Sequence, residues 1–91
     1  MKPRTRVTRY TVNALSPTHP KADLFAVHVE EATPGRWAIT NRFLHLGPDG
    51  QWAIPPYAGR SLPEALALAE HIAPRLVVNG VSVTDAISSP T

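Results

Sequence analysis

Cysteine is absent from this chain of 91 residues, and that absence excludes several kinds of chemistry together. Without thiols the chain has no disulfide, no thiolate nucleophile and no cysteine-ligated zinc site. The missing cysteines, and the lack of an apolar segment after the basic N-terminus, favour a cytoplasmic location. No apolar run approaches the roughly 20 residues that span a bilayer, so we expect no membrane partner.

Catalytic motifs are missing as well. The five glycines form no phosphate-binding loop, and no serine lies in a Gly-x-Ser-x-Gly turn. Glu30 and Glu31 point to opposite faces of a predicted strand, which makes them a poor acid–base pair. The sequence therefore predicts a protein that is not an enzyme and has no cofactor.

The four histidines raise a metal hypothesis. His28 and Glu30 share a strand face, and His45 can join them if its strand is a neighbour. No two histidines have the close spacing of known local ligand pairs on a helix or a strand. We therefore predict no metal site and interpret His28 and His45 as half-exposed sheet residues.

The composition is that of one folded domain, with 43% apolar and 18% charged residues. We expect a basic N-terminal arm (1–9), a single domain (10–87) and a frayed tail (88–91). Arginine outnumbers lysine, and alanine and proline are abundant. This usage is common in high-GC organisms such as actinobacteria and their phages.

Short runs of β-branched and aromatic residues predict an antiparallel sheet. Gly47-Pro48-Asp49-Gly50 is a strong hairpin turn signal. Asn41-Arg42 is either a tight turn or a bulge, and we favour a bulge, which makes residues 36–46 one bent strand. The expected strand segments are 5–13, Leu24–Glu31, Arg36–Thr40, Phe43–Leu46 and Gln51–Ile54.

One helix is predicted after the sheet. Ser61 and Glu64 form a capping box at its start, and Pro74 ends it. Residues 75–78 then suggest a short strand and Asn79-Gly80 a turn, while residues 81–87 form either a returning strand or a helical turn. The apolar stripe of the helix comprises Leu62, Leu66, Ala69, Ile72 and Ala73, widened by Ala65 and Leu68.

Together these elements predict an α+β fold, in which four to five short antiparallel strands pack against one main helix in the order β-β-β-β-α-β. The predicted core comprises Phe25, Val27, Val29, Trp37, Ile39, Phe43, Leu62, Leu66 and Ile72.

Positive charge is concentrated at the N-terminus. Residues 1–10 hold four basic and no acidic residues, whereas residues 11–91 hold five basic and seven acidic ones. A basic arm with hydroxyl side chains can follow a phosphate backbone without reading sequence. The alternative is a solvated tail. The candidate nucleic-acid-binding residues are Lys2, Arg4, Arg6, Arg9, Arg36 and Arg42, with Arg60 as a possible extension.

A protein partner is the alternative function. Trp52 and Tyr57 flank a proline pair and form an aromatic patch if they are exposed; if buried, they belong to the core. Residues 5–13 or the short strand of Leu76, Val77 and Val78 can also present a free edge for self-association.

The outline of residues 35–73 resembles the three-stranded-sheet-plus-helix domains at the N-termini of phage-type tyrosine recombinases. The resemblance is carried by the strand, the Gly-Pro-Asp-Gly turn, the next strand and Ser-Leu-Pro-Glu-Ala-Leu at the helix start, and it implies a sheet that enters the DNA major groove. The segments Phe43–Leu46 and Gln51–Ile54 depart from that pattern, because they carry His45 and Gln51 but no arginine or lysine. The analogy in outline assigns no family.

The leading hypothesis is a small binding module, such as an accessory protein of a mobile element, that contacts nucleic acid through its basic arm. The alternative is a protein–protein or dimerising module with a solvated basic tail.

Overall fold

The computed structural model describes residues 7–54 and 57–88, and it has the α+β architecture that the sequence predicts. Five antiparallel strands form one sheet in the order β1-β2-β3-β4-β5, and a second, two-stranded sheet pairs β6 with β7. The strands are β1 (Arg9–Val12), β2 (Val27–Thr33), β3 (Arg36–Asn41), β4 (Leu44–Leu46), β5 (Trp52–Ala53), β6 (Val77–Val78) and β7 (Val81–Ser82).

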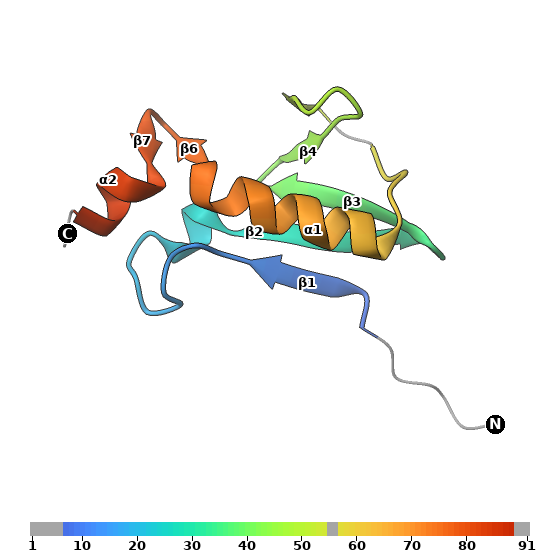
Figure 1. The fold of residues 1–91 in the computed structure, drawn as a ribbon, viewed down its shortest axis with the longest axis horizontal. Helices are drawn as coiled ribbons and strands as arrows, with labels where there is room; N and C mark the ends of the chain where they lie inside the picture. Colours follow the sequence, from blue (N-terminus) through green and yellow to red (C-terminus); the bar gives the residue numbers. More distant parts are fainter. Residues whose placement is uncertain (1–6, 55–56, 89–91) are drawn as a thin grey trace.

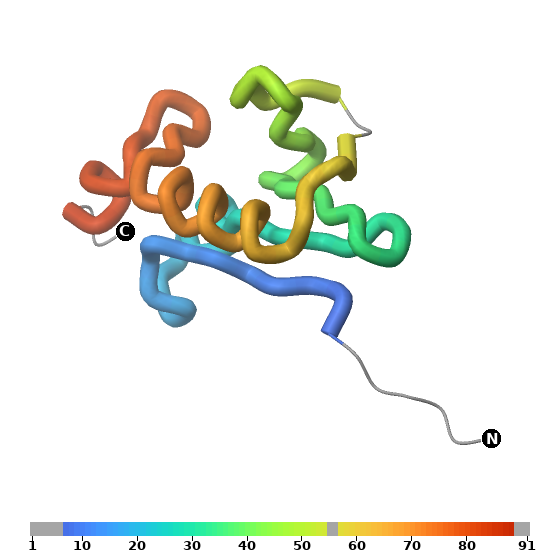
Figure 2. The backbone as a smooth tube through the Cα atoms, turned by 45° about the vertical axis from the view of Figure 1, so that its right-hand side comes forward, coloured from blue at the N-terminus to red at the C-terminus, as the bar shows by residue number. Residues whose placement is uncertain are grey.

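Helix α1 (Leu62–Ile72) lies across the sheet (Figures 1 and 2). It contacts β2 and β3, the strands in the middle of the sheet. Short helical segments complete the chain, and they are η1 (Ala22–Phe25), η2 (Ala73–Arg75) and α2 (Val83–Ser88). None of the helices within the described ranges has the length and apolar character needed to cross a membrane.

The core lies between α1 and one face of the sheet. Alternation along the strands turns Val27, Val29 and Ile39 toward the helix, and all three are fully buried. The most buried side chains of α1 are small: Ala65 and Ala69 are fully covered, and Ala73, four residues further on in η2, is almost fully covered. The predicted stripe is correct in direction, but Leu62, Leu66 and Ile72 lie at its margins, half-buried against the core.

Helix α1 begins at the predicted cap, Ser61, and one of the two hydrogen bonds of the predicted capping box is present. The Ser61 side-chain oxygen accepts a hydrogen bond from the Glu64 amide, at 3.4 Å. The helix ends at Ile72, and Pro74 lies in the following 3-10 turn. Residues 81–87 contain both of the predicted alternatives, since β7 returns from the Asn79-Gly80 turn and α2 follows at Val83.

Two predictions about the strands are wrong. Leu24 and Phe25 lie in the 3-10 helix η1, so the strand begins at Val27 rather than at residue 24. Residues 36–46 are two strands, not one bulged strand: Asn41 pairs with Leu44, and Arg42 and Phe43 form the turn between them. Arg42 takes the positive φ of 56° that this hairpin requires.

This turn also explains the wrong core assignment of Phe43. Its side chain is 80% exposed, because it projects from the tip of the β3–β4 hairpin instead of alternating into the core. The Gly47–Gly50 hairpin is confirmed: the Gly50 amide donates to the Gly47 carbonyl at 3.1 Å, and Leu46 pairs with Trp52 across it.

Candidate functional site

The face of the sheet opposite α1 is polar. One row runs across four strands, in which Thr11 of β1 pairs with His28, His28 with Thr40, and Thr40 with His45 of β4. A second row joins Arg9, Glu30 and Ala38. Arg36 alternates with the buried Trp37 and so belongs to the same side. We call this surface the open face, and it comprises Arg9, Thr11, His28, Glu30, Arg36, Ala38, Thr40 and His45.

A groove of about 240 Å³ follows the open face. Thr40 is only 4% exposed, and it lies between His28 and His45 in the row. Arg42 borders the groove from the β3–β4 turn and Asp23 from η1. We call it the polar groove, and it combines cationic, anionic and imidazole side chains. Its lining is Arg9, Asp23, His28, Glu30, Thr40, Arg42 and His45.

The surroundings of His28 change the pKa of its imidazole. Its Nδ1 lies 3.0 Å from the Thr11 hydroxyl. Partial burial lowers the pKa of His28, and the nearby Arg9 lowers it further, while Glu30 acts in the opposite direction. The imidazole is therefore neutral at pH 7, and its Nδ1 can accept the hydroxyl proton of Thr11.

The metal hypothesis gains no geometric basis. β3 separates the strands of His28 and His45, so the two rings are not on neighbouring strands. No cluster of three or more histidine and carboxylate side chains within residues 7–54 and 57–88 is arranged to hold a metal ion.

Three of the predicted nucleic-acid-binding arginines border the same side of the sheet. Arg9 is on β1 and Arg36 at the start of β3, and Arg42 follows the end of β3. Arg9 is paired with Glu30 at 3.0 Å. Among the described residues, Arg36 and Arg42 have no carboxylate partner. Lys2, Arg4 and Arg6 lie outside the described residues.

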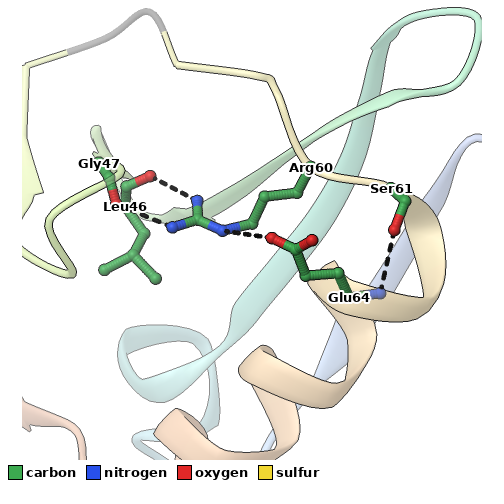
Figure 3. A network of polar contacts seen from close by, with 5 residues as sticks. All are labelled: Leu46, Gly47, Arg60, Ser61 and Glu64. Atoms are coloured by element: carbon green, nitrogen blue, oxygen red, sulfur yellow. Dashed lines mark hydrogen bonds and ion pairs between the residues drawn. The ribbon is translucent and has the colours of Figure 1, made fainter.

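Arg60 does not extend this basic surface. Its side chain is buried, and its guanidinium donates to the carbonyls of Leu46 at 3.0 Å and Gly47 at 2.8 Å (Figure 3). Its Nε also lies 3.8 Å from the Glu64 carboxylate. Arg60 is therefore a structural clamp between the β4–β5 hairpin and the start of α1.

Trp52 and Tyr57, the predicted aromatic patch, are half-buried and contact other parts of the fold. Trp52 is half-buried against the core. The Tyr57 ring lies 5.1 Å from the Arg60 guanidinium carbon, and the Tyr57 amide donates to His45 Nδ1 at 3.3 Å. The aromatic ring that projects into solvent is that of Phe43, which the sequence assigns to the core.

A second hollow, of about 260 Å³, lies beside Phe43. The β3–β4 hairpin forms one wall and the β6–β7 hairpin the other. Leu44 is 40% and Val77 61% exposed there. Arg42 is the one residue that borders both this hollow and the polar groove. We call it the turn hollow, lined by Asn41, Arg42, Phe43, Leu44, Val77, Val78 and Asn79.

Comparison with known proteins adds no relative. No protein-family model matches the chain, and neither a curated protein nor a solved structure matches it.

Proposed function

We propose that this protein is a small cytoplasmic nucleic-acid-binding module. It lays the open face of its sheet, together with the basic residues that precede β1, along a phosphate backbone. The observation that carries the proposal is that Arg9, Arg36 and Arg42, which are far apart in the sequence, border one side of the sheet. Guanidinium groups on one surface can each contact a different phosphate.

Two further features support the open face as the binding surface. Thr11, which is exposed, adds a hydroxyl group, and hydroxyls commonly contact phosphates alongside arginine. The described chain also starts beside the β2–β3 end of the sheet, since the Thr8 carbonyl accepts from the Glu31 amide. Arg36 stands at that same end of the sheet.

Acidic residues limit the affinity of this surface. Glu30 is paired with Arg9, and Asp23 borders the polar groove. A phosphate must compete with Glu30 for Arg9, so we assign the larger share of binding to Arg36 and Arg42. The expected mode is therefore weak to moderate binding that depends strongly on salt.

The test is fluorescence anisotropy of labelled DNA and RNA, single-stranded and duplex, titrated with the full chain over a range of salt concentrations. Arg36→Gln and Arg42→Gln should each weaken binding and reduce the salt slope by about 0.7 for a single strand or 0.9 for a duplex, as expected for one lost phosphate contact. Arg75→Gln is the matched control, because Arg75 is exposed after α1 and lies away from the open face. Absence of binding at low salt, or affinity that is independent of salt, contradicts the proposal.

A protein-binding module is the second candidate, supported by the exposed Phe43, Leu44 and Val77. In its self-associating form it predicts a concentration-dependent mass that approaches twice 9.9 kDa. Light scattering at increasing protein concentration tests it, and a monomer at every concentration rules that form out.

A further inference from the structure

Phe43 and Arg42 form an exposed recognition pair. The positive φ of Arg42 turns the chain at the tip of the β3–β4 hairpin, and the Phe43 ring is left 80% exposed. The guanidinium carbon of Arg42 lies 5.8 Å from the centre of that ring. An exposed aromatic side chain costs solvation free energy without contributing to the core. A ring held beside a cation at a hairpin tip is therefore suited to a flat, anionic ligand.

The opposite wall of the turn hollow supplies two other kinds of contact. Val77 of β6 presents an apolar side chain that is 61% exposed. Asn79 lies in the β6–β7 turn with a φ of 52° and is exposed, and its side-chain amide makes no hydrogen bond within the described residues. A free amide carries both donors and an acceptor, as the edge of a nucleobase does.

We propose that the turn hollow binds one unpaired nucleobase of a single strand. The base stacks on Phe43 and contacts Val77, the Asn79 amide faces its polar edge, and Arg42 contacts the adjoining phosphate. The rest of the strand passes Arg42, which borders both the hollow and the polar groove, and reaches the groove from there. A duplex keeps its bases stacked inside and cannot offer one to this site, whereas a single strand can. The inference rests on the proposed function and specifies its substrate as single-stranded.

A folded protein partner fits the same hollow less well. Three partly exposed apolar side chains give a few hundred Å² at most, well below the roughly 800 Å² per partner of stable protein complexes. The cation that borders the hollow also favours an anionic occupant. A single base with its phosphate matches both the small apolar area and the charge.

The test compares Phe43→Leu with the parent chain in anisotropy titrations of one labelled single strand and of its duplex. Leucine keeps an apolar side chain but removes the aromatic face. We expect Phe43→Leu to weaken single-strand binding by roughly five- to a hundredfold, the range for one lost stacking contact, and to leave duplex binding unchanged. Phe43→Trp should retain binding. Ile87→Ala, which removes an exposed apolar side chain from α2, is the matched control and should behave as the parent.

The outcomes separate this inference from the proposed function. If the parent binds in a salt-dependent manner but Phe43→Leu binds single strands equally well, the base site is wrong and the phosphate-binding face stands. If the parent binds no nucleic acid at all, both are wrong. If Phe43→Leu instead lowers the mass of a concentrated sample, the occupant is a second copy of the chain and the base site is overturned. A free mononucleotide can be tested as a competitor of the labelled single strand. If it binds as tightly as the strand does, the polar groove contributes nothing to binding, and the continuation of the strand into that groove is wrong.

Discussion

Arg60 is the residue on which the geometry around the helix start depends most. Its buried guanidinium donates to two backbone carbonyls, lies near Glu64 and stacks on Tyr57. Its backbone also bridges to Trp37, whose amide donates to the Arg60 carbonyl at 2.8 Å. A planar fork can satisfy both carbonyls together, but a lysine ammonium cannot reproduce that geometry.

We therefore expect Arg60→Lys to lower the free energy of unfolding by about 1–3 kcal/mol, the usual cost of leaving a buried acceptor unpaired. Urea unfolding measures it. Arg75→Lys, at an exposed site, should change stability by less than about 0.5 kcal/mol. Equal stability of the two variants would mean that the clamp contributes nothing.

His28 gives the fold a dependence on pH. Its pKa is lowered below the ordinary 6.5 by burial and by Arg9, against the opposing effect of Glu30. The unfolded chain therefore binds a proton at a higher pH than the folded chain does, so stability falls as the pH drops through about 6.5 toward the folded pKa. We expect His28→Gln to reduce the loss of stability between pH 7.5 and pH 5.5. Thermal unfolding at both pH values measures the difference, and an equal loss in the parent and the variant contradicts it.

At the scale of elements, α1 approaches the sheet closely because its buried stripe is alanine. Ala65 and Ala69 are completely covered, and α1 contacts β2 and β3. We expect Ala69→Leu to destabilise the protein by about 1–3 kcal/mol, since the added methylenes must displace well-packed neighbours. Ala67→Leu is the control on the exposed face of the same helix and should be nearly neutral. Chemical unfolding of the two variants decides, and an equal effect would show that the stripe is not tightly packed.

The elements that the sequence predicts correctly are those with local signals. Gly47–Gly50 and Asn79-Gly80 specify turns through residues that accept positive φ, and Ser61 marks the helix start by its side-chain chemistry. The Arg42-Phe43 turn has no glycine, asparagine or aspartate at either central position, so the alternative of a bulge was equally consistent with its residues. In a continuous strand the alternation of side chains would turn Phe43 toward the core, and the turn at Arg42 and Phe43 prevents this.

The candidate site required the register of the strands. Arg9, Arg36 and Arg42 are visible as basic residues, but their position along one side of the sheet depends on the pairing of β1 with β2, which joins segments about 17 residues apart, and on the exact turns of the β2–β3 and β3–β4 hairpins. The role of Arg60 was missed for the same reason, because its partners Leu46 and Gly47 lie on another hairpin. Polar residues just before a helix cap carry no local signal that distinguishes a buried clamp from a surface cation.

At the scale of the whole molecule, positive charge is unevenly divided along the chain. Residues 1–6 carry three basic side chains, whereas the remainder has six basic and seven acidic ones. The body is thus slightly acidic, and attraction to a polyanion depends on where its cations lie rather than on its net charge. The arrangement predicts two separable contributions to binding, one from the arm and one from the open face.

We expect the combined variant Lys2→Gln, Arg4→Gln and Arg6→Gln to reduce the salt slope of single-strand binding by about 2, because each lost phosphate contact removes about 0.7. The face variant, Arg36→Gln with Arg42→Gln, should reduce it by about 1.4 on the same basis. If the arm and the face contact different phosphates, the two reductions in salt slope add in the variant that carries all five substitutions. If binding depended on net charge alone, Arg75→Gln would weaken it as much as Arg36→Gln does. Anisotropy titrations across salt concentrations measure all of these variants against the parent, and a slope that is unchanged by the arm substitutions would restrict binding to the sheet.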